Sequence, residues 1–138
     1  MLGRPPRRAV SDEQSARYAR HLTLPEVGPE GQRLLNEASI LVVGAGGLGS
    51  PALLYLAAAG IGKIGIIDDD SVDLSNLQRQ VLHGTSSIGE GKVVSAERRL
   101  SDLNPEVTIE AYEARLGVDN ALDLIDSFDL VIDGSDNF

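Results

Sequence analysis

The chain has 138 residues, 42% of them hydrophobic, with 12 Lys plus Arg against 21 Asp plus Glu and no Cys. Its net charge of −9 excludes broad nucleic-acid binding, because an acidic body repels polyanions. The lack of Cys excludes disulfides, thiolate metal sites and thiol nucleophiles within these residues, and no apolar run is long enough to span a membrane. We therefore expect a cytoplasmic protein with neither nucleic acid nor membrane as a partner.

The chain begins with a basic tail, residues 1–10, that we expect to be disordered. Residues 11–22 predict a helix capped by Ser11, with acidic residues in its first turn. Residues 28–37 predict a second short helix. We treat residues 11–38 as a helical arm, which opens a domain that spans 11–138.

Strands and helices alternate after this arm. Apolar or alternating runs predict strands at 40–43, 63–68, 107–112 and 129–133, with helices near 47–60, 89–103 and 118–126 between them. This order predicts an α/β fold, a Rossmann-like parallel sheet with crossover helices. Because the sequence ends where another crossover would normally follow, we expect a sheet that is incomplete at the C-terminus, and hence an N-terminal fragment.

A glycine pattern joins the first strand to its helix. Gly44, Gly46 and Gly49 match G-x-G-x-x-G, in which glycine lets the backbone approach a phosphate at a helix N-terminus. Asp68 follows Gly44 by 24 residues, at the end of the next strand, where an acid can accept hydrogen bonds from ribose hydroxyls. The alternative is a packing turn with an ordinary Asp at a strand end. The two features together predict a nucleotide site.

Two cations after the second strand favour ATP over NAD. A triphosphate carries about four negative charges, whereas one helix end offsets about half a charge. Arg79 and Lys92 could supply further positive charge. One cation at about 4 Å from a phosphate oxygen contributes roughly 4 kcal/mol of attraction at an effective dielectric of 20. The alternatives are a surface ion pair of Arg79 with Asp73 or a neighbouring residue, and a solvated Lys92 in the first turn of a helix.

Longer segments resemble the ThiF/MoeB/HesA family of adenylyltransferases, which are similar to the adenylation half of ubiquitin-activating enzymes. The resemblance covers residues 11–138 and is most specific in SNLQRQ and DGSDN. It implies binding of ATP and Mg²⁺, activation of the C-terminal glycine of a ubiquitin-like sulfur-carrier protein as an acyl-adenylate, and release of pyrophosphate. The molybdopterin and thiamine branches both remain open.

The resemblance also implies residue roles. Gly47 would lie against the nucleotide, and Asp68 would hold the ribose. Asn76, Arg79 and Lys92 would face the phosphates. Asp136 would be the magnesium-linked acid, with capping of a following helix as its alternative, and Arg20 would reach into the other subunit of a homodimer.

Several candidates have a second interpretation. His21 and His83 could act as bases, although structural roles are the expectation. Asp69, Asp70 and Asp73 could bind a metal, although a solvated loop is expected.

The family continues beyond DGSDNF with a docking surface for the carrier, and often with cysteine pairs for structural Zn²⁺. We therefore expect the 138 residues alone to be inactive in the full reaction. The alternative functions are an NAD(P)-binding oxidoreductase domain and an inactive partner half of an activating enzyme.

Overall fold

The computed structural model of the protein describes residues 12–135, which divide into two units between Leu34 and Leu35. The first unit contains α1 (Asp12–Arg17), α2 (Ala19–Leu22) and most of α3 (Gly28–Glu37), which continues across the division. The helix expected at 28–37 is confirmed. The helix expected at 11–22 is interrupted at Tyr18, whose φ of −104° and ψ of 19° depart from helical values. Its cap, Ser11, lies outside the described residues.

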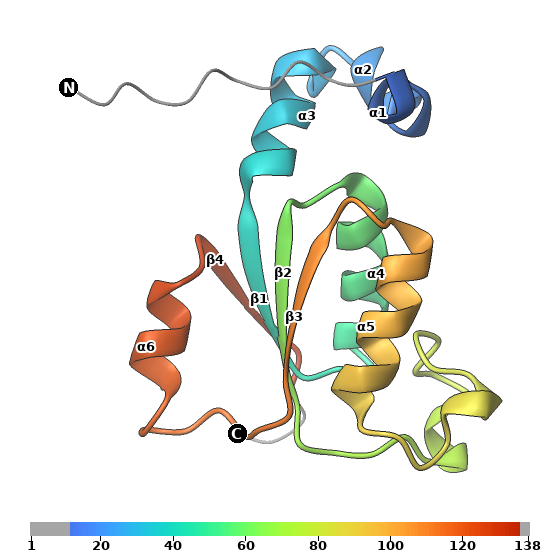
Figure 1. The fold of residues 1–138 in the computed structure, drawn as a ribbon, viewed down its shortest axis with the longest axis vertical. Coiled ribbons are helices and arrows are strands. Elements are labelled where there is room, and N and C mark those ends of the chain that lie inside the picture. Colours follow the sequence, from blue (N-terminus) through green and yellow to red (C-terminus); the bar gives the residue numbers. More distant parts are fainter. Residues whose placement is uncertain (1–11, 136–138) are drawn as a thin grey trace. The chain divides into compact units, whose positions relative to one another are not determined.

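The second unit is built on a four-stranded sheet in which all neighbouring strands are parallel (Figure 1). The sheet has the order β3-β2-β1-β4, and its strands are β1 (Ser39–Val43), β2 (Lys63–Ile67), β3 (Thr108–Tyr112) and β4 (Leu130–Asp133). This arrangement confirms the predicted α/β, Rossmann-like fold with crossover helices. All four strands lie where the sequence predicts them, to within one residue at each end.

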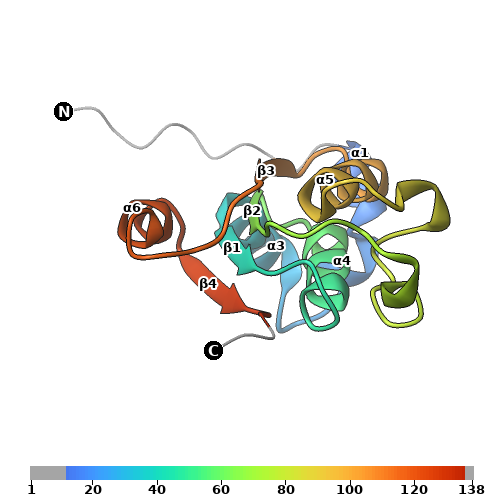
Figure 2. The same cartoon turned by 90° about the horizontal axis from the view of Figure 1, so that it is seen from below.

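Helices cover both faces of this sheet. As Figure 2 shows, α4 (Gly49–Ala59) and α5 (Lys92–Leu103) lie on one side and α6 (Ala121–Asp126) on the other. Helix α4 ends because Gly60 adopts the left-handed conformation, with a φ of 88°. Helix α5 begins three residues later than predicted, because Gly89 also has a positive φ and Gly91 pairs with Ser71 in an isolated bridge. Two 3-10 turns, Leu74–Asn76 and Thr85–Ser87, lie in the connection between β2 and α5.

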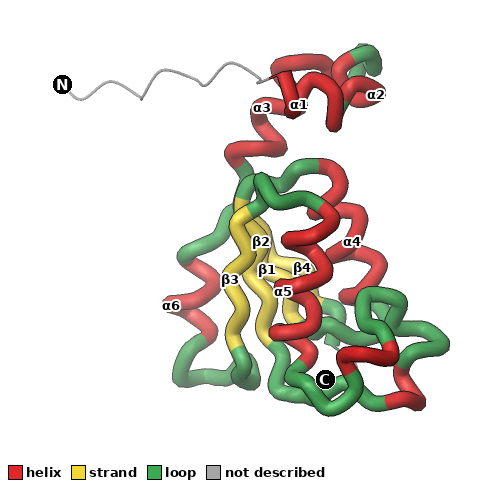
Figure 3. The backbone as a smooth tube through the Cα atoms, turned by 45° about the vertical axis from the view of Figure 1, so that its right-hand side comes forward, coloured by secondary structure: helices red, strands yellow, loops and turns green. Residues whose placement is uncertain are grey.

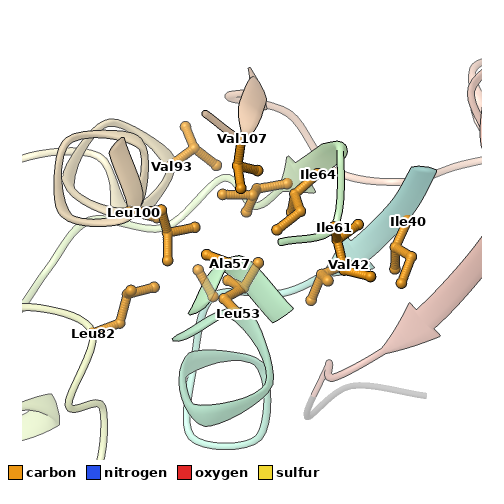
Figure 4. Close-up of a cluster of buried hydrophobic side chains, with 13 residues drawn as sticks. Ile40, Val42, Leu53, Ala57, Ile61, Ile64, Leu82, Val93, Leu100 and Val107 are labelled. Carbon is orange, nitrogen blue, oxygen red and sulfur yellow. The ribbon is translucent and has the colours of Figure 1, made fainter. Parts of the chain in front are cut away.

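Aliphatic side chains form the core on the α4 and α5 face (Figure 4). Leu53 and Ala57 of α4 pack with Leu100 of α5 against the strand residues Val42 and Ile64, and all five are fully buried. The burial of this face fixes α4 and α5 on the sheet, because apolar area removed from water contributes about 25 cal/mol per Å².

A smaller apolar cluster lies on the α6 face, where Leu41 and Ile67 pack with Phe128. Gly65 of β2 makes room for the Phe128 ring, since a Cβ at this position would overlap the ring. Figure 3 shows the strands lying between the helices of the two faces. Within residues 12–135, no helix combines the length and the apolar character that crossing a bilayer requires.

The connections place a switch point beside β1. The chain proceeds from β1 to β2 to β3 on one side and then returns to pair β4 with the other side of β1. In open parallel sheets, ligands bind beyond the carboxyl ends of strands at such a point. The loops that follow Val43 and Asp133 are therefore the first place to look for a site.

Candidate nucleotide site

The loop after β1 contains two glycines that the fold itself requires. Gly44 has a φ of +94°, and a Cβ there would lie 3.1 Å from the carbonyl oxygen of Gly134. A Cβ on Gly49 would overlap the carbonyl oxygen of Gly44. Side chains at these positions would therefore collide with backbone that cannot move cheaply.

Gly46 and Gly47 are different, because no feature of the described residues requires glycine there. Neither has a positive φ. A Cβ would meet only ordinary contacts, with Gln80 Nε2 at 3.6 Å from position 46 and Arg79 Cδ at 3.7 Å from position 47. The absence of side chains at these two positions therefore keeps the surface of the loop open to an approaching molecule.

Helix α4 follows the loop with its first amides unoccupied by any side-chain cap. Leu48 is the N-cap residue, and its side chain accepts no hydrogen bond from the helix. The first N–H groups of an α-helix carry the positive end of its dipole and have no partner within the helix. In α4 one of them, the Ser50 N–H, already donates to the Gly46 carbonyl over 2.9 Å. Together with the open surface of Gly46 and Gly47, this end of α4 suits a phosphate.

Asp68 fastens the glycine loop at the end of β2. Its Oδ2 accepts a hydrogen bond of 2.8 Å from the Ala45 N–H, and its Oδ1 accepts one of 2.8 Å from the Asp70 N–H. A carboxylate oxygen can accept a second hydrogen bond, so these contacts are compatible with ribose binding. The carboxylate thus has a structural contact that the sequence did not predict.

A cavity of about 310 Å³ opens at the carboxyl ends of the strands. Four of the sequence-predicted residues line it: Gly44, Gly46, Asp68 and Lys92. Four of its other lining residues are charged: Asp69, Asp70, Asp133 and Arg115. Four carboxylates and two cations thus line a single hollow.

Lys92 lies at the first position of α5, and its side chain is only 7% exposed. Its ammonium group is 3.7 Å from Asp70 Oδ2, and its backbone N–H donates to the Asp70 carbonyl over 2.9 Å. The alternative in which Lys92 is a solvated helix residue is therefore wrong. A buried ammonium group at the wall of a cavity is available to an anion that enters the cavity.

Arg79 and Asn76 lie outside the cavity lining. The exposed Arg79 donates from Nη1 to the Ser75 carbonyl over 3.3 Å, and its side chain lies beside Gly47. Asn76 Oδ1 accepts from the Asp73 N–H in a capping box. Hydrogen bonds from Ser75 hold the pKa of Asp73 below its usual value, and within residues 12–135 no ion pair joins Asp73 to Arg79.

Two of the predicted residues cannot be placed at this cavity. Arg20 belongs to α2 in the first unit, and Asp136 lies outside the described residues. Their roles therefore stay predictions. His21, also in the first unit, forms a 2.8 Å hydrogen bond with Gln32 through Nδ1 and stacks on Tyr18.

Sequence reasoning gave no individual role to three residues that line the cavity, Asp133, Ser135 and Arg115, although the first two belong to the DGSDN motif. Asp133 ends β4 and accepts two hydrogen bonds from Ser135, from the hydroxyl at 2.6 Å and from the backbone N–H at 2.9 Å. These bonds lower the pKa of Asp133. Arg115 lies in the loop after β3. All three lie at or just beyond the carboxyl end of a parallel strand, and that rule could have identified them.

His83 and Gln80 lie behind the glycine loop. His83 is buried, and both of its ring nitrogens are hydrogen bonded, to Ala45 and to Ser95. This geometry agrees with the expected structural role rather than with a base. Gln80 is 2% exposed, its Nε2 lies near Gly46, and its Oε1 has no hydrogen-bond partner among the described residues.

Comparison with known proteins places this geometry in a family. The ThiF family matches residues 18–138. A Thermus thermophilus protein named sulfur carrier protein adenylyltransferase is 54% identical over 126 residues, which are 91% of this chain and 46% of that protein. The probable adenylyltransferase/sulfurtransferase MoeZ of Mycobacterium tuberculosis is 53% identical over 133 residues, which are 96% of this chain and 34% of MoeZ.

Solved structures agree with the sequence relatives. The E. coli tRNA N6-threonylcarbamoyladenosine dehydratase TcdA, solved in complex with ATP, matches 93% of this chain and 52% of its own, with 32% identity and a TM-score of 0.87. The chain spans between about a third and about half of the proteins that it matches. The family match and the shared sheet lead to one conclusion: the chain belongs to the ThiF family.

Proposed function

We propose that the chain supplies the ATP site of an adenylyltransferase that acts on a ubiquitin-like sulfur-carrier protein. One observation carries the proposal: the buried Lys92, the Asp68 carboxylate and the open glycine loop share one cavity. The name of the Thermus thermophilus relative, sulfur carrier protein adenylyltransferase, supports this choice of substrate. No comparable observation favours an NAD(P)-dependent oxidoreductase.

ATP would bind with its ribose on Asp68 and its phosphates along Gly46, Gly47 and the first turn of α4. Lys92 would contact the phosphates from the cavity wall. Arg79, beside Gly47, would approach them from the outer side of the loop, with Asn76 nearby in the chain. Each cation within about 4 Å of a phosphate oxygen contributes roughly 4 kcal/mol of attraction before desolvation, at an effective dielectric of 20.

The reaction would be an in-line displacement at the α-phosphorus of ATP. One oxygen of the carrier's C-terminal carboxylate forms a bond to that phosphorus. The bond from the phosphorus to the oxygen that bridges the α- and β-phosphates breaks, and this oxygen leaves with pyrophosphate. The carboxylate needs no general base, because its pKa of about 3.5 leaves it ionised at neutral pH. Catalysis would rest on alignment and on neutralising the charge that moves onto pyrophosphate.

The charge of the cavity supports a role for Mg²⁺. Asp68, Asp69 and Asp70 can bring carboxylate oxygens within 4.8 Å of one another, and oxygen is the ligand type that Mg²⁺ prefers. We propose that Asp136, which follows the cavity residue Ser135 in sequence, holds the ion together with phosphate oxygens. When bound, Mg²⁺ would neutralise the departing pyrophosphate.

The oligomeric state belongs to the same proposal. Arg20 would enter the site of a second subunit, so the working enzyme would be a homodimer. Analytical ultracentrifugation of the full-length protein and of its Arg20→Ala variant tests the dimer, and carrier-dependent pyrophosphate exchange by both tests the role of Arg20. We expect Arg20→Ala to remain dimeric and to lose exchange activity, and a monomeric active wild type would contradict the proposal.

Carrier-dependent exchange of radiolabelled pyrophosphate into ATP tests the activity itself. The full-length protein is assayed with a ubiquitin-like sulfur carrier and, as the control, with the same carrier lacking its C-terminal glycine. We expect exchange only with the intact carrier. Titration with ATP–Mg²⁺ and with NAD⁺ is the second measurement, and a preference for NAD⁺ would overturn the proposal. ATP binding without exchange would instead indicate an inactive partner half.

A further inference from the structure

Ala45, in the middle of the glycine loop, is anchored through both of its backbone polar groups. Its N–H donates to Asp68 Oδ2 over 2.8 Å, and its carbonyl oxygen lies 2.9 Å from His83 Nε2 and also accepts a longer hydrogen bond of 3.4 Å from the Ser50 hydroxyl. The residue is completely buried. The Gly46 carbonyl that follows accepts from the Ser50 N–H over 2.9 Å, so the direction of the open loop surface depends on the Asp68 and His83 contacts together with the start of α4.

The hydrogen-bond partners determine which nitrogen of His83 carries the proton. A backbone carbonyl oxygen only accepts, so Nε2 must be the donor to Ala45. Nδ1 then accepts from the Ser95 hydroxyl, which lies 2.7 Å away. The neutral ring is only 6% exposed, which leaves it little room to turn.

Ser95 connects this contact to the helix that carries Lys92. It lies on α5, three residues after Lys92, and is itself buried. One ring therefore joins two parts of the candidate site that are far apart in sequence. On one side is the loop that would hold phosphates, and on the other is the helix that presents the ammonium group.

We propose that His83 is a positioning residue, which holds the backbone of Ala45 and with it the surface of Gly46 and Gly47 that would contact the nucleotide. The nucleotide part rests on the proposed function. His83 does not touch the reacting atoms. Its contribution acts through Ala45, and the hydrogen bond from Nε2 is the essential one.

Two near-isosteric variants separate the contacts of His83. Gln can place an amide nitrogen near the position of Nε2, so His83→Gln retains a donor for Ala45. Asn reaches only the position of Nδ1, so His83→Asn retains the contact with Ser95 and loses Ala45. Fluorescent mant-ATP suits the binding measurement, because the chain has no Trp.

We expect His83→Gln to bind within about threefold of wild type. His83→Asn should bind about tenfold more weakly, the change produced by one hydrogen bond of typical net strength. Ser95→Ala, the matched control, should resemble His83→Gln. Equal affinities of His83→Asn and wild type would overturn the proposal, as would equal losses in His83→Asn and His83→Gln.

Amide hydrogen exchange in the absence of nucleotide provides an independent measurement. We expect the amides of Gly46 and Gly47 to exchange faster in His83→Asn than in His83→Gln, with the sheet equally protected in both. This result would support the positioning role even if wild type bound no ATP, a failure that would count against the proposed function alone. Equal loop exchange in both variants would refute the positioning role.

Discussion

Gly46 gives the sharpest test of the candidate site, because its replacement by Ala should separate folding from binding. A Cβ at this position would meet nothing closer than 3.6 Å, and its φ is not positive. Gly→Ala at a compatible position typically stabilises a protein by about 0.4–1 kcal/mol, through the entropy of the unfolded chain. We therefore expect Gly46→Ala to fold with unchanged or slightly raised stability.

Binding should change in the opposite direction. The added methyl group would stand between the loop and an incoming phosphate and would lengthen the hydrogen bonds that amides donate to it. Hydrogen bonds to a charged group are worth about 1.5–3 kcal/mol each, so losing two of the weaker kind costs about 3 kcal/mol. At 1.4 kcal/mol per tenfold, the expected increase in Kd for ATP–Mg²⁺ is about 100-fold.

Gly49→Ala is the matched control, because a Cβ there would overlap the Gly44 carbonyl oxygen. It should lower the free energy of unfolding by about 1–3 kcal/mol or more, as overpacking does. Urea unfolding followed by circular dichroism measures stability, and isothermal titration calorimetry measures Kd. A folded Gly46→Ala variant that binds ATP like wild type would refute the assignment of this surface to phosphate.

Other substitutions test neighbouring groups. Asp68→Ala should weaken ATP binding and also lower the free energy of unfolding by about 1–3 kcal/mol, because the Ala45 and Asp70 amides lose their acceptor; unchanged ATP affinity in calorimetry would count against ribose contact. In the full-length protein, Arg79→Ala should abolish most carrier-dependent pyrophosphate exchange while the fold is retained, and unaltered exchange would remove Arg79 from the site. Tyr112 donates a 2.6 Å hydrogen bond to Glu110, which raises its pKa to about 12. The folded-state pKa of Tyr112 exceeds the usual tyrosine value of about 10. The stability that the hydrogen bond to Glu110 contributes is therefore complete below pH 10 and is lost as the pH rises towards 12. Titration followed by ultraviolet absorbance should show one tyrosine in wild type that ionises at high pH and is absent from the Tyr112→Phe variant. Identical titration curves for the two proteins would disprove the raised pKa.

The sequence predicted the sheet well, because its strands carry strong local signals. The continuous apolar run at residues 40–43 suits a strand buried on both faces, and β1 occupies it. Helix boundaries were less accurate. The start of α5 depends on a bridge between Ser71 and Gly91, a contact across 20 residues that no local pattern reveals.

The site was only partly predictable for a similar reason. The glycine spacing and Asp68 could be read from one βαβ unit, and both lie at the cavity. The contributions of Asp133 and Arg115 arise because β3 and β4 lie on opposite sides of the first two strands, and that follows from the strand order. The contact between His83 and Ala45 joins residues that are 38 positions apart, and no sequence motif predicts it.

The two backbone amides that Asp68 holds have a consequence for what else could occupy this position. Glutamate has the same charge and could still meet a sugar hydroxyl, yet its extra methylene would carry the carboxylate away from the Ala45 and Asp70 amides. Asparagine would fit the space, but its NH₂ end would oppose one of those amides as a second donor. A residue chosen only for its affinity to a sugar would therefore displace the glycine loop that we propose for the phosphates. The ribose end of the proposed site thus cannot be redesigned independently of its phosphate end.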